Sequence, residues 1–136
     1  MTVLVIDAQG GGIGKQLVAA IKQNIPAASV IAVGTNSAAT TAMLKAGADE
    51  VATGENSVVV ACRRADIIVG PIGIVIADAL LGEITPKMAC AVAQSRAKRI
   101  LIPFNHCDNL IVGISDFSTG ALIQNAVREI QRFADQ

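Results

Sequence analysis

The sequence predicts a doubly wound α/β fold whose sheet is Rossmann-like and mostly parallel. Short apolar runs rich in β-branched residues alternate with stretches of helical periodicity. A glycine cluster directly follows the first of these runs. Right-handed crossovers then favour the strand order 3-2-1-4-5-6, with the last strand as an antiparallel edge strand. The length of 136 residues fits a single Rossmann-like domain spanning residues 1–136.

The first half of the chain is expected to contain three strands, each followed by a helix. The β-branched run over 3–6 is typical of a buried parallel strand, and residues 30–33 and 50–52 are predicted to form the second and third strands. Sequence signals for helix ends lie between and after these runs. Pro26 closes the first helix, residues 35–37 cap the second before Gly47 ends it, and the third covers 55–65.

The fourth strand is predicted over residues 67–69 and ends in the turn Gly70–Gly73. The segment 74–81 that follows is apolar, and we expect it to be helical. Gly82 is the predicted stop of this segment. The dipeptide Thr85-Pro86 then places a capping residue before a proline at the first helical position. This pattern predicts a helix that begins there and ends at about residue 98.

The last part of the chain is expected to complete the sheet. Apolar runs predict a fifth strand over 100–102 and a sixth over 110–114. The loop 105–109 between them is short, and a short connection implies an antiparallel hairpin at one sheet edge. Asp116 or Ser118 is then expected to cap a final helix that carries one apolar face.

Charge and hydropathy exclude several classes of protein. The 11 Lys and Arg residues balance the 11 Asp and Glu residues, so no basic field points to a nucleic-acid partner. A hydrophobic content of 52% excludes a disordered chain. The most apolar stretch, 67–81, is shorter than the ~20 residues that a membrane helix needs. No signal peptide precedes the first strand, so we expect no membrane association.

The scarcity of reactive residue types narrows the chemistry further. The chain has no Tyr, so no reaction can use a tyrosine proton donor. His106 is the only histidine, which excludes a site with two histidine ligands from one chain. The three cysteines, Cys62, Cys90 and Cys107, are an odd number without C-x-x-C spacing. We therefore expect no metal site, no disulfide framework and a reduced, cytoplasmic setting.

The glycine cluster is the strongest functional signal in the sequence. Residues 7–15 read DAQGGGIGK and link the first strand to the first helix. Glycines there let backbone amides approach a phosphate, and the helix N-terminus favours negative charge. We weigh this above a tight turn that only needs positive φ. The residues expected to hold phosphate are Gly10, Gly11, Gly12, Gly14 and Lys15.

This loop matches no standard nucleotide-binding pattern completely. The P-loop pattern aligns at Gly14-Lys15 but finds Gln9 and Gln16 where it needs Gly and Ser or Thr, so the usual magnesium ligand is missing. The dinucleotide pattern fits only loosely, as glycines at positions 10, 12 and 14. The short-chain dehydrogenase pattern matches in part, but its catalytic tyrosine is absent. The expected cofactor is a nucleotide or dinucleotide without further specification.

Other residues at the same sheet edge are expected to contact the rest of the ligand. Thr35 and Asn36 follow the second strand, where NAD-binding folds place an acidic residue for the ribose. Asn36 brings no charge, and a helix-capping role is at least as well supported. After the fourth strand, Pro71, Ile72 and Gly73 are expected to form an apolar wall. The set favours a small phosphate-bearing ligand over NAD or NADP specifically.

Two residues are weak candidates for catalysis. Asp7 ends the first strand, where it could bind a metal or hydroxyl or simply accept hydrogen bonds from loop amides. His106 lies in the loop Asn105–Asn109, which also contains Cys107 and Asp108. Because Asn and Asp are ordinary turn residues, we favour a hairpin turn there. Cys62 and Cys90 are expected to be small core residues.

Three segments together carry a family resemblance. They are DAQGGGIGKQ at 7–16, GPIGIV at 70–75 and GEITP at 82–86. The chain resembles a family of short bacterial proteins classed as a domain of unknown function, over essentially its whole length. The resemblance implies a Rossmann-like fold and a bacterial, cytoplasmic origin, but no reaction.

Three functional hypotheses follow from the sequence. The first is a small nucleotide- or phosphometabolite-binding module with a sensory or regulatory role. The second is an enzyme whose active site is completed by a partner subunit, with Asp7 and His106 on opposite loops. The third is a structural homo-oligomeric assembly protein, because apolar faces and few charges suit contacts between copies.

Overall fold

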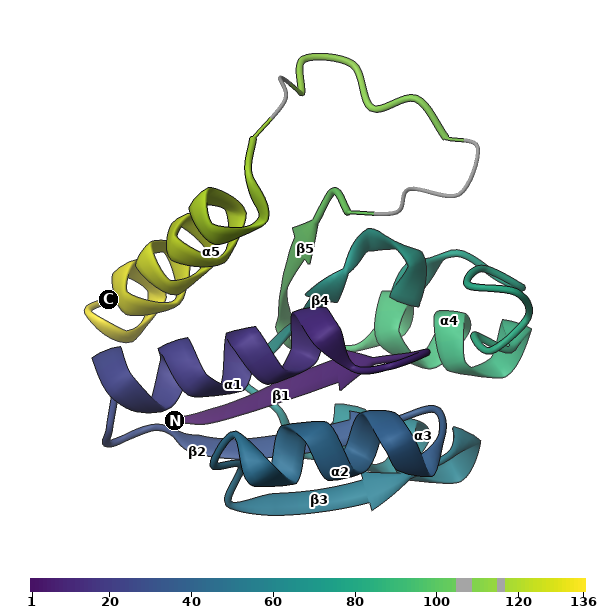
Figure 1. The fold of residues 1–136 in the computed structure, drawn as a ribbon, viewed down its shortest axis with the longest axis horizontal. Helices are drawn as coiled ribbons and strands as arrows, with labels where there is room; N and C mark the ends of the chain where they lie inside the picture. Colours follow the sequence, from purple (N-terminus) through teal and green to yellow (C-terminus); the bar gives the residue numbers. More distant parts are fainter. Residues whose placement is uncertain (105–108, 115–116) are drawn as a thin grey trace.

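A computed structural model of the protein describes residues 1–104, 109–114 and 117–136. It contains a five-stranded sheet in the order β3-β2-β1-β4-β5, in which all pairings are parallel (Figure 1). The strands are β1 (Thr2–Asp7), β2 (Ser29–Gly34), β3 (Glu50–Thr53), β4 (Ile67–Pro71) and β5 (Lys98–Ile102). The α/β class and the order of the first five strands are therefore confirmed.

Helices cover both faces of this sheet. They are α1 (Gly12–Asn24), α2 (Ser37–Lys45), α3 (Glu55–Arg64), α4 (Pro86–Gln94), α5 (Thr119–Ala134) and the 3-10 helix η1 (Ile72–Val75). The buried apolar side chains of α1, α2 and α5 share one apolar cluster with the sheet, except that of Ala39 in α2. Those of α3, η1 and α4 share a second cluster on the other face. Figure 1 is seen from the α1 and α2 side.

The central strand β1 explains why the two clusters form. Val3 and Val5 belong to the first cluster, whereas Leu4 and Ile6 belong to the second. All four side chains are at most 1% exposed. Successive side chains of a strand point to opposite faces, so an uninterrupted apolar run is what a strand buried on both sides requires.

The predicted helix caps are largely confirmed. The Asn36 side chain accepts a hydrogen bond from the Ala39 amide, and the Thr85 side chain accepts one from Met88. Ser118 is the N-cap of α5 and accepts a hydrogen bond from the Ala121 amide. The alternative cap, Asp116, lies outside the described residues.

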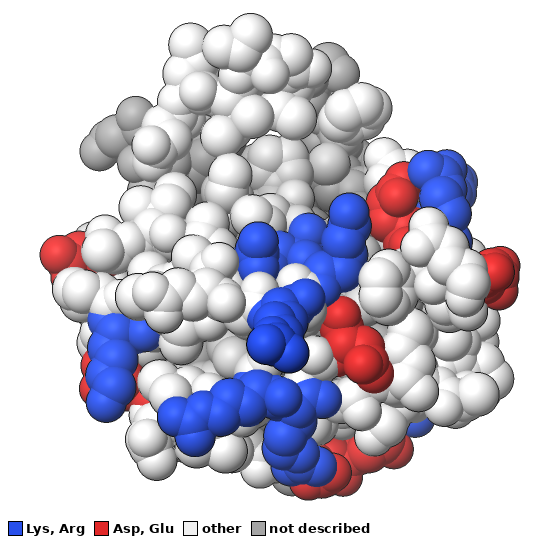
Figure 2. Space-filling model, turned by 180° about the vertical axis from the view of Figure 1, so that it is seen from behind, with Lys and Arg blue, Asp and Glu red and all other residues white. Residues whose placement is uncertain are grey.

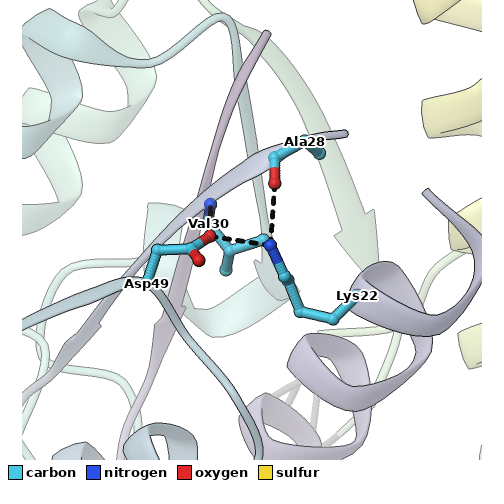
Figure 3. A network of polar contacts seen from close by, with 4 residues as sticks. All are labelled: Lys22, Ala28, Val30 and Asp49. Carbon is cyan, nitrogen blue, oxygen red and sulfur yellow. Dashed lines mark hydrogen bonds and ion pairs between the residues drawn. The ribbon is translucent and has the colours of Figure 1, made fainter. Parts of the chain in front are cut away.

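A polar network at the amino edge ties α1 to the sheet (Figure 3). The Lys22 ammonium lies 2.9 Å from Asp49 Oδ2 and donates to the Ala28 carbonyl over 3.0 Å. Asp49 Oδ2 also accepts a hydrogen bond of 2.8 Å from the Val30 amide. The Val30 amide and the Lys22 ammonium lower the pKa of Asp49 below its ordinary value, despite a small opposing effect of burial.

The predicted sixth strand over 110–114 is wrong. The described residues 109–114 contain no strand, and no antiparallel pairing occurs in the described sheet. Leu110 and Val112 are 88% and 91% exposed, so their apolar side chains pack on no described sheet face. Gly113 adopts φ +87°, which interrupts an extended backbone. The hairpin loop predicted over 105–109 falls mainly on residues 105–108, outside the described part of the chain.

The helix predicted over 74–81 is also wrong. Only the 3-10 helix η1 forms, and turns then cover residues 77–83. The run Ile74-Val75-Ile76 is β-branched throughout, which disfavours helix continuation. The chain instead closes into a compact loop in which the Asp78 amide donates to the Ile84 carbonyl over 2.7 Å. We call residues 78–84 the 78–84 loop.

Among the described residues, no helix has both the length and the apolarity that a membrane span requires.

Candidate functional site

The carboxyl ends of β1 and β4 border a small hollow at the edge of the sheet. These strands are neighbours, yet their following chain segments run to opposite faces, because α1 belongs to one cluster and η1 to the other. Such a reversal point is where doubly wound folds bind ligands. This hollow has a volume of about 190 Å³, and we call it the glycine-loop hollow. Most of its lining comes from the glycine loop and the start of α1. The lining residues are Asp7, Ala8, Gln9, Gly10, Gly11, Gly12, Ile13, Gln16, Pro71, Leu80, Phe104 and Thr119.

Two of the four loop glycines are required by packing. Gly11 adopts φ +74°, and a Cβ there would lie 2.9 Å from the Cα of Ala39 in α2. A Cβ on Gly14 would lie 2.6 Å from Met43 Sδ and 2.8 Å from the Cβ of Asp7. These two glycines therefore let α1 approach α2 and β1 closely, which is a purely structural need.

The other two glycines have no such internal reason. A Cβ on Gly10 or Gly12 would meet nothing within 4 Å, and neither residue has a positive φ. Both residues line the glycine-loop hollow. The fold would accommodate larger side chains at these positions, so the absence of a side chain leaves space at the hollow rather than in the core.

Backbone amides are available beside this space. Gly12 and Ile13 begin α1, where N–H groups have no partner inside the helix. The amides of Gly10, Gly12 and Ile13 donate to no acceptor in the described part of the chain. Unpaired amides at the positive end of a helix favour an anion.

The Asp7 carboxylate holds the two ends of the glycine loop together through hydrogen bonds. It is 5% exposed, and its two oxygens accept hydrogen bonds from the amides of Gly14 (2.6 Å) and Ala8 (2.8 Å). Burial raises the pKa of Asp7, and these two hydrogen bonds oppose the shift without cancelling it. This is the amide-accepting arrangement that the sequence allowed beside a catalytic role.

Glu83 is the residue that the sequence analysis missed. It comes from the 78–84 loop, and its Oε1 accepts three hydrogen bonds. The donors are Thr35 Oγ1 at 2.7 Å, Asn36 Nδ2 at 2.7 Å and the Gln9 amide at 3.0 Å. Partial burial acts to raise the pKa of Glu83, but the three hydrogen bonds outweigh it and the pKa lies below its ordinary value. Glu83 is therefore a carboxylate at neutral pH.

The expected sugar-binding residues thus already share an internal partner. Thr35 and Asn36 lie directly after β2, as predicted, and both bind Glu83. Asn36 also donates to the Gln9 carbonyl over 2.9 Å. Glu83 joins the β2–α2 turn to the glycine loop, and it places a negative charge at the end of β2 where the local sequence has none.

The remaining predicted site residues are the expected apolar wall after β4 and Lys15 of α1. Pro71 lines the glycine-loop hollow, and Gly73 is buried where a Cβ would touch Ala79 and Leu80. Ile72, the third member of the expected apolar wall, is half-buried at the start of η1. Lys15 does not line the glycine-loop hollow; it lines a groove between α1 and α2 together with Lys45.

The loop 105–108 lies outside the described residues, so the structure does not place His106. The two described cysteines differ from each other. Cys62 is buried, and desolvation raises the pKa of its thiol to about 11, which keeps it protonated and unreactive. Cys90 is exposed, so its expected place in the core is wrong.

A second, larger hollow lies between α3 and α4 and has the opposite electrostatic character. It measures about 540 Å³, and its lining includes Arg63, Lys87 and Arg96. None of these three cations forms an ion pair with a described residue. Figure 2 shows Lys and Arg side chains gathered near the middle of the face seen from behind. The glycine-loop hollow instead has Asp7 in its lining and Glu83 hydrogen-bonded to Gln9, another lining residue.

These features define a class of protein. An all-parallel sheet in the order 3-2-1-4-5, with a glycine loop between β1 and α1, is the architecture of Rossmann-like proteins. Within this class, the chain belongs to the family described as Domain of unknown function (DUF3842), whose model matches residues 2–135. The family resemblance noted in the sequence is therefore confirmed.

Comparison with other proteins adds information on the fold alone. No curated protein matches the chain in sequence. Among solved structures, a dodecameric FMN-dependent UbiX-like decarboxylase from Escherichia coli O157:H7 is 18% identical with a TM-score of 0.46, and 96% of this chain aligns with 76% of that one. AibC is 21% identical with a TM-score of 0.48, and 96% of this chain covers 41% of it.

A third similar structure is an NADPH-dependent quinone oxidoreductase from Escherichia coli. It is 13% identical with a TM-score of 0.42, and 75% of this chain covers 46% of it. The chain therefore spans less than half of AibC and of this oxidoreductase. At these identities the similarity concerns the arrangement of strands and helices, and it identifies no ligand for this chain.

Proposed function

We propose that the protein binds a nucleotide or another phosphate-bearing metabolite in the glycine-loop hollow, as a sensory or regulatory module. The observation that carries this proposal is the pair Gly10 and Gly12. No internal contact accounts for either glycine, and both line the hollow beside amides without a partner among the described residues. Space and unpaired donors at a helix N-terminus are what a phosphate requires.

Each predicted site residue has a role in this proposal. The amides of Gly10, Gly12 and Ile13 would hold the phosphate, while Gly11 and Gly14 shape the loop. Lys15, one turn along α1, would add positive charge from the neighbouring groove between α1 and α2. On the sugar side the contacts would come from Thr35 and Asn36, and on the apolar side from Pro71, Ile72 and Gly73.

Thermal unfolding in the presence of phosphate compounds tests the proposal. The panel contains inorganic phosphate and the 5′-monophosphates of adenosine, guanosine, cytidine and uridine. A ligand at 100 times its dissociation constant stabilises the fold by about 2.7 kcal/mol, which raises Tm measurably. If no compound of the panel raises Tm at millimolar concentration, the proposal is wrong.

A matched pair of variants locates the site. Gly12→Val would fill the hollow beside the free amides, and the ligand-induced rise in Tm should disappear. Gly120→Val is the control, because Gly120 also lies in a first helical turn and its Cβ position is equally open. The control should keep the full rise. An unchanged rise in Gly12→Val would contradict binding at the glycine loop.

A second candidate function, self-association, is favoured by a separate observation. Large apolar side chains are exposed along one segment, namely Leu110 (88%), Val112 (91%), Ile114 (48%) and Phe117 (52%). Figure 1 shows the described residues 109–114 arching away from the sheet. An exposed apolar run of this kind is typical of a surface that another subunit covers. We therefore propose a homo-oligomer whose contacts include this segment.

Light scattering with one matched pair tests the oligomer. Leu110→Gln should shift the protein toward smaller species at a given concentration. Leu44→Gln removes an apolar side chain that is 52% exposed on α2 and should leave the mass unchanged. A monomeric wild-type protein at high concentration would contradict the proposal.

A further inference from the structure

We propose that Glu83 makes the site selective for an unmodified ribose, by accepting hydrogen bonds from the sugar hydroxyls and excluding ligands that carry a phosphate there. This inference rests on the proposed nucleotide binding and names the part of the ligand that faces the end of β2. Glu83 would then determine specificity, although it lies 47 and 48 residues from the two β2–α2 turn residues it contacts.

The position of the carboxylate is the first argument. Dinucleotide-binding folds place an acidic residue at the end of the second strand, where it binds the ribose hydroxyls. This chain has Thr35 and Asn36 at that point, and neither carries a charge. Glu83 Oε1 lies 2.7 Å from Thr35 Oγ1 and 2.7 Å from Asn36 Nδ2. The negative charge therefore stands at the end of β2 after all, supplied by a different loop.

The use of the two carboxylate oxygens is the second argument. Oε1 accepts all three hydrogen bonds, from Gln9, Thr35 and Asn36, whereas Oε2 accepts none from the described residues. One oxygen fixes the side chain and the other remains able to accept. An ionised carboxylate is an acceptor only, so it matches hydroxyl donors and repels a phosphate.

The rigidity of the 78–84 loop is the third argument. Ala79, Leu80 and Ile84 are buried, and the Asp78 amide closes the loop on Ile84. Leu80 and Leu81 both adopt φ +58°, a left-handed conformation that costs a non-glycine residue about 1–2 kcal/mol. Such strain persists only where surrounding contacts enforce it, and it clusters at functional sites. The loop therefore holds Glu83 in place before any ligand arrives.

The distribution of charge then orients the ligand. The unpaired amides of Gly12 and Ile13 lie at the start of α1, whereas Glu83 lies where the β2–α2 turn meets Gln9 of the glycine loop. A 5′-phosphate is favoured only at the first end and a neutral diol only at the second. The ligand class that satisfies both ends is a ribonucleoside 5′-phosphate with free 2′ and 3′ hydroxyls.

The test compares two phosphorylation patterns on one nucleoside by isothermal calorimetry. The tightest-binding ribonucleoside 5′-monophosphate of the four is measured against the 2′,5′-bisphosphate of the same nucleoside. The wild-type protein should bind the bisphosphate at least about tenfold more weakly, because its second phosphate meets Glu83. Glu83→Gln keeps an oxygen for the three donors and removes the charge, and it should narrow the difference to about threefold or less.

Asp78→Asn is the matched control. It removes one negative charge from the same loop, and Asn tolerates the left-handed conformation of this exposed position. The control should keep the wild-type discrimination. Circular dichroism and Tm of both variants verify that the fold is intact.

The outcomes separate this inference from the proposed function. If inorganic phosphate or a monophosphate binds but the bisphosphate binds equally well, the role of Glu83 is wrong while phosphate binding stands. A discrimination that survives in Glu83→Gln, or is lost equally in Asp78→Asn, also overturns it. If no compound binds, the proposed function fails and this inference fails with it.

Discussion

The glycine loop and the 78–84 loop meet at the same edge of the sheet, yet they form left-handed turns in different ways. The glycine loop uses Gly11, for which φ +74° is unstrained, although Gln9 is also left-handed at φ +53°. The 78–84 loop uses Leu80 and Leu81, for which a φ of +58° is unfavourable, although Asp78 (φ +65°) and Gly82 (φ +82°) in the same loop tolerate the left-handed region. In the glycine loop the residue type allows the left-handed conformation, whereas in the 78–84 loop the surrounding packing enforces it.

This difference shows what each loop contributes. The glycines at positions 11 and 14 make room for close packing, and those at 10 and 12 leave room at the hollow. The 78–84 loop makes no room; it buries Leu80 and Ile84 and thereby presents Glu83 to its three donors. The glycine loop thus provides space at the site, and the 78–84 loop provides the negative charge of Glu83.

Gly11→Ala should have the largest effect on this comparison. The new Cβ would stand 2.9 Å from the α2 backbone at Ala39, in a left-handed residue. The overpacking and the backbone strain together should lower the free energy of unfolding by about 3 kcal/mol. Urea unfolding at pH 7 measures it. A loss below about 1 kcal/mol would show that α1 and α2 adjust easily, contrary to tight interior packing.

Glu83→Ala comes next, with a pH dependence. It removes three hydrogen bonds from a partly exposed carboxylate, which should lower the free energy of unfolding by about 1–2 kcal/mol at pH 7. The pKa of Glu83 is lowered in the folded state, so its stabilisation is present above the unfolded pKa and is lost as the pH falls through the folded pKa. The difference between wild type and variant should therefore shrink in urea unfolding below about pH 4. A difference that grows on acidification would contradict this account.

Leu81→Gly should raise the free energy of unfolding, in contrast to the two preceding substitutions. The Leu81 side chain is 96% exposed, so little packing is lost, while the strain at φ +58° is relieved. After the entropy penalty of glycine in the unfolded chain, we expect a gain of about 0.5–1 kcal/mol. Ala27→Gly is the control, since Ala27 is an exposed turn residue without a positive φ and should show no gain. Equal effects in both variants would mean that the 78–84 loop is not strained.

Gly12→Ala should have the smallest effect, again a gain. Its Cβ meets nothing within 4 Å, and alanine favours the helix that begins there. A rise of about 0.5 kcal/mol in the free energy of unfolding is expected, opposite in sign to Gly11→Ala at the adjacent position. Differential scanning calorimetry of the two variants side by side checks this contrast. A destabilised Gly12→Ala protein would imply a structural need for this glycine.

Most of the fold could be predicted from local sequence patterns. The apolar runs gave the first five strands, and the capping residues Asn36 and Thr85 marked the starts of α2 and α4. These signals lie within a few residues of the elements that they predict, so they can be recognised without knowledge of the tertiary structure.

Errors arose where a pattern depended on distant partners. Residues 110–114 form an apolar run typical of a strand, but in the described part of the chain no neighbouring strand pairs with them. At the site, the glycine loop and the Thr35-Asn36 pair were expected at the same sheet edge, where the structure places them. Glu83 could not be found in this way, because its three contacts span 47 to 74 residues and arise only when the 78–84 loop packs.

The central position of β1 has a consequence for experiments in solution. This strand has a neighbouring strand on each side and an apolar cluster on each face, and Val3, Leu4 and Val5 are fully buried. We expect their amide protons to reach water only when the molecule opens globally. Hydrogen–deuterium exchange at these three residues should therefore report the free energy of unfolding without denaturant. A ligand that binds only the folded protein should slow this exchange by a factor of one plus the ratio of free ligand concentration to its Kd.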